Sequence, residues 1–218
     1  GHTEFLVALR EGLPQLRGIV CGADWSFGFK ALGKFNDLEQ FCLQHGLTAT
    51  AVAPVLFQGE RISSTHVRQA IRDGNVLYAG QLLGRSFSLA GTVVPGRAIG
   101  RELGYPTANI ASDKELIPAP GIYAAYTSIE ASLEDCDSVD RHPSAVFIGE
   151  RSTFQDTEPV IESYLLDFQG DLYGRSIEVY FVEKIRDVYP FSSKEQLIEQ
   201  MARDVVQVRD VLAGRDIR

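Results

Sequence analysis

The chain has 218 residues, of which 44% are hydrophobic and 23% are charged, as in an ordinary globular protein. No apolar run approaches the ~20 residues that a membrane span needs, and no signal-peptide pattern opens the chain, so we expect a cytoplasmic protein without membrane contact. Three cysteines without metal-ligand spacing agree with a reducing compartment.

The net charge of −8 is unevenly distributed along the chain. Residues 1–83 hold seven basic and seven acidic side chains, so residues 84–218, with 14 basic and 22 acidic ones, carry all of it. Such a surface does not attract nucleic acid. A polyphosphate bound to the acidic part would need a metal ion or backbone donors to offset the repulsion.

The first part of the chain alternates helix and strand patterns, which predicts an α/β layer structure. Ser63 or Ser64 can cap one of its helices, and Gly84 can end the last one. The expected elements are, in order, a short helix before Pro14, a buried strand at 18–22, a helix at 35–43, a strand at 48–56, and helices from the cap to Gly74 and over 76–83.

After Gly84 the pattern changes to short strands separated by glycine, proline and aspartate, which favours a small antiparallel β-barrel. The acidic stretch at 130–140 is too polar for a core and is expected to be a solvated loop. The five expected strands are 86–94, 121–129, 144–148, 160–168 and 176–185.

A final helix follows the strands. Ser192-x-x-Glu195 is the pattern of a capping box, and apolar residues then recur on one helical face. We therefore predict two domains, an α/β domain at 1–83 and a β-barrel with a C-terminal helix at 84–218. The apolar face comprises Leu197, Met201, Val205, Val208 and Leu212.

The segment 91–109 contains regularly spaced glycines at Gly96, Gly100 and Gly104. Without a Cβ, such residues let backbone N–H groups approach an anion closely, which suits ATP phosphates. No Gly-Lys-Ser/Thr follows, so this is not a Walker loop.

The end of this segment reads Pro106-Thr107-Ala-Asn109. Pro106 restricts the turn, so that Thr107 and Asn109 can present a hydroxyl and an amide oxygen in a set geometry. These are hard ligands suited to Mg²⁺ that also keeps water and phosphate oxygens.

The joined string resembles the riboflavin kinase family, whose loop reads Gly-x-x-x-Gly-Arg-x-Leu-Gly-Tyr/Phe-Pro-Thr-Ala-Asn. The resemblance covers residues 84–212 and implies phosphorylation of riboflavin to FMN with ATP and Mg²⁺. Further segments resemble the family in the same order: Leu116-Ile-Pro118, Gly121-Ile-Tyr123, Glu162-Ser-Tyr-Leu-Leu-Asp-Phe168, Asp171-Leu-Tyr-Gly174, Lys184-Ile-Arg186 and Phe191-Ser-Ser-x-Glu195-x-Leu197.

The resemblance implies that Glu162 is the general base for the terminal ribityl hydroxyl. The local pattern agrees, because Glu162 shares its strand phase with Tyr164 and Leu166, on an otherwise apolar face. We expect this carboxylate to face the Thr107/Asn109 pair across the barrel. Arg186 resembles a residue of the family's flavin-covering segment.

Three departures from the family pattern concern residues around the expected flavin site. Ser152 stands where the family usually has Pro, Tyr164 where it often has His, and Val188 and Pro190 replace an acidic and a basic residue. They motivate an alternative, a flavin- or nucleotide-binding module without turnover. A generic β-barrel interaction domain is a third hypothesis.

The front part resembles the rear of a bacterial FMN adenylyltransferase module, through Gly22-Ala-Asp24-Trp-Ser-Phe-Gly28 and Ile62-Ser-Ser64-Thr65-His-Val-Arg68. The module's early Gly-x-Phe-Asp-Gly-x-His-x-Gly-His stretch is absent from this sequence. We therefore expect a piece of a bifunctional FAD synthetase, with adenylyltransferase activity only in an intact parent chain. A degenerate half is the alternative. The resemblance implies small-molecule partners only.

Overall fold

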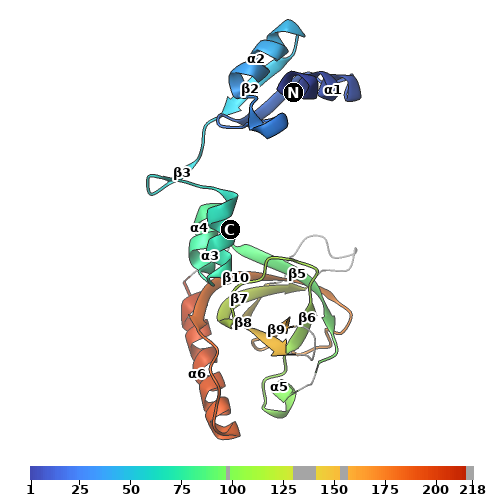
Figure 1. Ribbon diagram of the computed structural model, residues 1–218. Coiled ribbons are helices and arrows are strands. Elements are labelled where there is room, and N and C mark those ends of the chain that lie inside the picture. Colours follow the sequence, from blue (N-terminus) through green and yellow to red (C-terminus); the bar gives the residue numbers. More distant parts are fainter. Residues whose placement is uncertain (97–98, 130–140, 153–156, 215–218) are drawn as a thin grey trace. The chain divides into compact units, whose positions relative to one another are not determined.

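The computed structural model describes residues 1–96, 99–129, 141–152 and 157–214. The expected acidic loop at 130–140 lies outside the described residues. The chain divides into two compact units, Gly1–Ile62 and Ser63–Arg218. Each unit is described here by itself (Figure 1).

The first unit is a small α/β layer, as predicted, but the strand at 18–22 that was expected to be buried is not, since its Val20 is 69% exposed. Its strands β1 and β2 are parallel, with Gly18 paired to Thr48, and helices α1 and α2 contribute Leu6 and Leu38 to the unit's apolar core. The elements are α1 (His2–Gly12), β1 (Gly18–Gly22), η1 (Phe29–Ala31), α2 (Phe35–Gln44), β2 (Thr48–Val52), β3 (Leu56–Phe57) and β4 (Glu60–Arg61).

The second unit opens with a helical hairpin, α3 (Ser64–Arg72) and α4 (Val76–Leu83). Ser63 caps α3, because its hydroxyl accepts a hydrogen bond from the backbone N–H of His66. Helix α4 packs against strands of the barrel, and its Val76 belongs to the barrel's core. The compact units therefore divide before this hairpin, whereas the predicted domain boundary lies after it.

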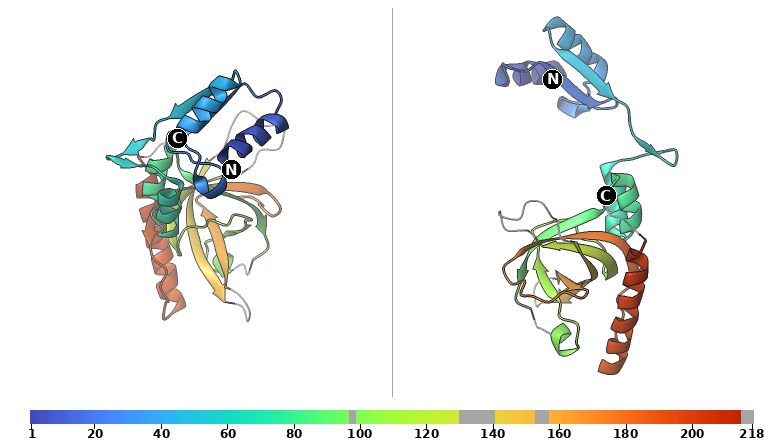
Figure 2. Two further views of the ribbon diagram at one scale, coloured as in Figure 1. Left: turned by 45° about the horizontal axis from the view of Figure 1, so that its top comes forward. Right: turned by 180° about the vertical axis from the view of Figure 1, so that it is seen from behind.

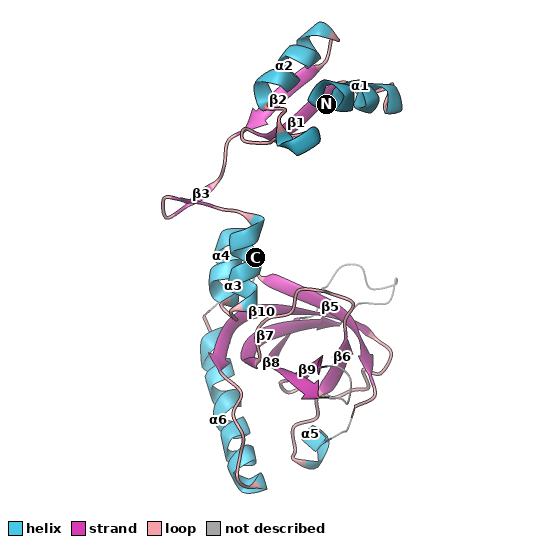
Figure 3. Cartoon of the chain, in the orientation of Figure 1, coloured by secondary structure: helices cyan, strands magenta, loops and turns pink. Residues whose placement is uncertain are grey.

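The rest of the second unit is a closed six-stranded antiparallel barrel in the order β10-β5-β6-β9-β8-β7, which confirms the predicted architecture (Figure 3). Alternate side chains fill its interior, among them Leu89, Val146 and Val179. The strands are β5 (Phe87–Val94), β6 (Ala108–Ala111), β7 (Gly121–Ile129), β8 (Arg141–Ser152), β9 (Thr157–Leu165) and β10 (Ser176–Arg186).

Helix α6 (Lys194–Leu212) lies along the outside of the barrel in all views (Figures 1 and 2). It packs on β7, β8 and β10, and its predicted residues Val205, Val208 and Leu212 join the cluster that includes Leu166. The predicted cap is wrong by one residue. Ser193 caps the helix by accepting from the N–H of Gln196, because Ser192 is instead bonded to the Gln196 side chain.

Candidate functional site

Thr107 and Glu162 meet on one face of the barrel. The Thr107 hydroxyl donates a hydrogen bond of 3.0 Å to Oε2 of Glu162. Asn109 is the register partner of Glu162 across β6 and β9, so both side chains project from the same side of the sheet. The structure therefore brings together the three oxygen-bearing residues that the sequence predicted.

The expected arrangement across the barrel is wrong, because Asn109 and Glu162 stand on neighbouring strands. Strand β6 was not predicted from the sequence. It is only four residues long and reads Ala-Asn-Ile-Ala, which is too short for an alternating pattern to stand out from a loop. Its pairing with β9 is what aligns the amide of Asn109 with the carboxylate.

Gly96 and Gly100 lie close to these side chains. A Cβ on Gly96 would come within 2.1 Å of Asn109 Nδ2, and one on Gly100 would meet Tyr105 O at 2.4 Å and Thr107 Oγ1 at 3.2 Å. Both positions therefore require glycine for the close packing of the loop around the Thr/Asn pair, an explanation that holds whether or not an anion is bound.

Gly104 has a different role. Its φ of +86° is in the left-handed region that favours glycine, and no neighbouring atom lies where a Cβ would point. Its N–H is bonded to the carbonyl of Arg101, and the N–H of Tyr105 to that of Gly100. These two donors serve the turn itself, so a phosphate would have to use other N–H groups of the loop.

Thr107 borders two cavities. The first, the helix-side cavity, has a volume of about 70 Å³ and lies between β8, β9 and α6. Glu162 and Thr107 form one side of it, and α6 contributes the other. It is lined by Tyr105, Thr107, Ile122, Ala145, Val146, Phe147, Glu162, Tyr164, Met201, Asp204 and Val205.

The second, the loop-side cavity, has a volume of about 80 Å³ and includes Thr107, Ser163 and residues of the segment after β9. Arg101 supplies a positive charge and Asp171 a negative one, and Phe168 and Tyr173 supply aromatic surface. The guanidinium suits a phosphate oxygen and the rings suit contact with part of a planar ligand, since about 80 Å³ does not enclose a whole nucleotide. The Thr107 side chain thus lies between the helix-side cavity, which contains Glu162, and the loop-side cavity, which contains Arg101.

The departure at Tyr164 is visible in this geometry. Tyr164 lines the helix-side cavity beside Glu162 and makes an edge-to-face contact with Tyr105, with ring centroids 5.4 Å apart. The departure at Val188 lies in the loop after β10, where that residue is exposed. The side chain of Ser152 lies outside the described residues.

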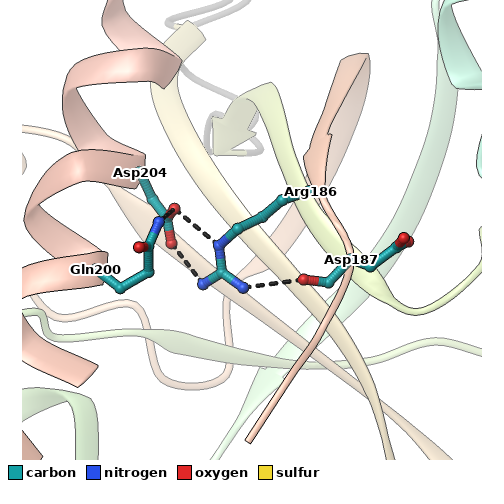
Figure 4. A network of polar contacts seen from close by, with 4 residues as sticks. All are labelled: Arg186, Asp187, Gln200 and Asp204. Carbon is teal, nitrogen blue, oxygen red and sulfur yellow. Dashed lines mark hydrogen bonds and ion pairs between the residues drawn. The ribbon is translucent and has the colours of Figure 1, made fainter. Parts of the chain in front are cut away.

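Arg186 ends β10 next to this site, and its guanidinium points to α6 (Figure 4). It donates to both carboxylate oxygens of Asp204, over 2.9 and 2.7 Å. Direct contact of Arg186 with a flavin stays a prediction.

The adenylyltransferase-like residues are divided between the two units. Asp24 belongs to the first and is paired with Arg61, whose hydrogen bond lowers the pKa of the Asp24 carboxyl below its usual value. Ser64, Thr65 and Arg68 stand on α3 in the second unit. Sequence reasoning missed Arg61, since a lone arginine in a short hairpin carries no motif.

Comparison with known proteins identifies the second unit. The model of the riboflavin kinase family matches residues 83–212, which is more than half of the chain. The chain belongs to the riboflavin kinase family. The matched residues coincide with the barrel and α6. A second family model, described as FAD synthetase, matches residues 2–66.

Curated relatives resemble nearly the whole chain. A bifunctional riboflavin kinase/FMN adenylyltransferase from Buchnera aphidicola is 33% identical over 94% of this chain and 64% of its own length. The protein of the same name from Escherichia coli K12 is 35% identical over 90% of this chain and 60% of its own. This chain thus spans about three fifths of the length of these relatives.

A solved structure also resembles most of this chain. A crystal structure described as a macrolide-efflux protein from Streptococcus pneumoniae is 35% identical, with a TM-score of 0.78, over 88% of this chain and 60% of that one. Among the described residues of the present chain, no helix is both long enough and apolar enough to cross a membrane.

Proposed function

We propose that the second unit transfers the γ-phosphoryl group of ATP to the terminal ribityl hydroxyl of riboflavin and so produces FMN. The observation that carries this proposal is the hydrogen bond between Thr107 and Glu162. It joins the end of the glycine-rich loop to one carboxylate, at the border of two small cavities, one that could take the end of the acceptor chain and one that could take a phosphate of the nucleotide.

Glu162 has the geometry of a general base. Its Oε2 accepts from Thr107, and no side chain among the described residues donates to Oε1. A hydroxyl in the helix-side cavity could therefore donate to Oε1 and be oriented for attack. A cavity of about 70 Å³ suits the end of a sugar-alcohol chain, since pockets for whole drug-sized ligands measure roughly 300 Å³ or more.

In the reaction, the bond from the ribityl oxygen to the γ-phosphorus forms while the bond from that phosphorus to the β–γ bridging oxygen breaks. ADP leaves with the electron pair, and Glu162 takes the hydroxyl proton. The chain's contribution is then mainly positioning and the placement of charge, as is general for phosphoryl transfer.

Thr107 and Asn109 fit the Mg²⁺ that the family implies. The Thr107 hydroxyl donates a hydrogen bond to Glu162, which leaves the lone pairs of that hydroxyl free for a cation. The structure shows no cluster of three His, Cys, Asp or Glu side chains able to hold a metal, as far as its described residues extend. Magnesium would then rest on neutral oxygens and on the phosphates, whose charge it offsets.

We further propose that a complete parent protein also carries FMN adenylyltransferase activity, as the names of the relatives state for those proteins. Asp24, Ser64, Thr65 and Arg68 would belong to that second site. The match of the FAD synthetase model to residues 2–66 supports this assignment for Asp24, Ser64 and Thr65, and Arg68 lies just beyond the matched range.

One assay tests the kinase proposal. The chain is mixed with riboflavin, ATP and Mg²⁺, and the products are separated by chromatography. We expect FMN and ADP in equal amounts, and neither without Mg²⁺. Quenching of riboflavin fluorescence without any FMN would instead support the non-catalytic binding module, and the absence of any thermal stabilisation by Mg-ATP would favour an interaction domain.

A further inference from the structure

The junction of β10 and α6 contains a nearly buried ion pair. The side chains of Arg186 and Asp204 are 17% and 6% exposed, and they are joined in the bidentate geometry that orients both groups (Figure 4). Removing two charges from water carries a desolvation penalty that can exceed their mutual attraction, so such a pair is weak evidence for stability. A role other than holding the fold together is therefore worth seeking.

Both members of the pair are held from further directions. Gln200 donates to Oδ1 of Asp204 over 2.8 Å, and Arg186 also donates to the carbonyl of Asp187 over 3.0 Å. Tyr189 and Phe191 flank the guanidinium, with ring centroids 4.7 and 5.8 Å from it. The Asp204 carboxylate thus has a single orientation.

That carboxylate lines the helix-side cavity, in which Glu162 also stands. A carboxylate can accept about four hydrogen bonds. Oδ1 of Asp204 accepts two, from Arg186 and Gln200, whereas Oδ2 accepts one, from Arg186. One acceptor position on Oδ2 is left for a ligand.

The two carboxylates of the cavity differ in surroundings. Asp204 faces a guanidinium that neutralises it, whereas Glu162 accepts from a neutral hydroxyl. Asp204 is therefore fixed in place by its donors, whereas Glu162 keeps Oε1 for the hydroxyl that attacks.

We propose that Asp204, oriented by Arg186, positions the acceptor by accepting a hydrogen bond from a second hydroxyl of its polyol chain. This inference rests on the proposed kinase function. Arg186 acts on the substrate through Asp204, and the substrate class that the cavity selects is a polyol with at least one hydroxyl besides the one that is phosphorylated.

The test compares Asp204→Asn with a matched variant of another ion pair on the same helix. Arg209 of α6 donates to both oxygens of Asp167, but these side chains are 50% and 74% exposed and line neither cavity described above. Asn tolerates the positive φ of 59° at residue 167, so Asp167→Asn removes a contact between α6 and the barrel without backbone strain.

We expect Asp204→Asn to raise the KM for riboflavin roughly tenfold or more, the size for loss of a hydrogen bond to a charged group, with a much smaller change of kcat. Asp167→Asn should leave KM unchanged. Because Asp204→Asn strands a buried guanidinium, Arg186→Met with Asp204→Leu provides a second arm. It removes the carboxylate while restoring apolar packing, and it should show the same rise in KM.

A native KM in a folded Arg186→Met/Asp204→Leu variant would overturn the proposal, as would equal KM changes in Asp204→Asn and Asp167→Asn. If the native chain makes no FMN, the kinase proposal fails by itself. Riboflavin binding by fluorescence quenching then still tests the inference, with weaker binding expected for Asp204→Asn and native binding for Asp167→Asn.

Discussion

The two compact units differ in how completely their sheets are covered. The barrel closes on itself, so each of its strands has two partners and no edge is open. The parallel sheet of the first unit consists of β1 and β2, and Val20 and Val52 on these strands are 69% and 50% exposed. Parallel strands are normally buried on both faces. The exposed Val20 and Val52 therefore show that the first unit leaves apolar surface of its sheet uncovered, in contrast to the closed barrel.

The candidate functional residues are also distributed differently between the two units. Those of the proposed kinase site all belong to the second unit, where the register of β6 and β9 pairs Asn109 with Glu162. Those that resemble an adenylyltransferase come from both units.

The largest expected effect concerns the barrel core. Phe181 is 1% exposed and packs against Tyr123 and Phe87. Phe181→Ala should lower the free energy of unfolding of the second unit by about 3–5 kcal/mol, whereas Val20→Ala in the first unit should change its own by no more than ~0.5 kcal/mol. Denaturant unfolding measures both, and equal effects would contradict the contrast between the units.

The next effect concerns the proposed base. Glu162→Gln should slow FMN formation by at least ~10²-fold while leaving ATP binding largely intact, since it removes only the proton acceptor. Glu60→Gln, at an exposed position in the first unit, is the matched control and should keep the native rate. Initial rates of FMN formation decide, and a native rate for Glu162→Gln would remove that residue from the role.

A smaller effect is expected at the glycine loop. Gly96→Ala places a methyl group within 2.1 Å of Asn109 Nδ2, so the amide must move, and we expect a rate loss of roughly tenfold with a higher Mg²⁺ requirement. Gly104→Ala should instead cost about 1–2 kcal/mol of stability through its positive φ. Mg²⁺ titrations of the rate separate the two variants. Equal Mg²⁺ requirements in the two variants would argue against a Mg²⁺ site at Asn109.

The smallest effect is a pH dependence. Burial, with a further contribution from the charge of Asp187, raises the pKa of Tyr123 above its usual value. A folded-state pKa above the unfolded one stabilises fully below pH ~10, and this stability is lost as the pH rises beyond that value. The loss should be smaller in Tyr123→Phe, measured by unfolding between pH 9 and 11. An equal loss of stability with rising pH in the native chain and in Tyr123→Phe would contradict this prediction.

Much of the fold follows from local patterns. The glycines and prolines after Gly84 separate five segments that are indeed strands, and the apolar spacing in α6 predicts which of its residues face the barrel. The cap of α6 and strand β6 were missed. Adjacent serines offer equivalent caps, and β6 exists because β5 and β9 flank it, which is a tertiary effect.

The candidate site likewise contains residues that the sequence predicted and one that it did not. Thr107, Asn109 and Glu162 were predictable because a motif carries them. Asp204 was not, because a single aspartate in an amphipathic helix resembles a solvated residue until the fold brings Arg186 against it. That contact joins positions that are close only once the helix has packed on the barrel.

The central claim is that Thr107 and Glu162 act together on one transfer step. The direct measurement is a double-mutant cycle on kcat for FMN formation, with Thr107→Val, Glu162→Gln and both. We predict that the double variant is about as slow as the slower single variant, because each change disrupts the same arrangement. Rate losses that multiply would show that the two residues act independently and would contradict the account.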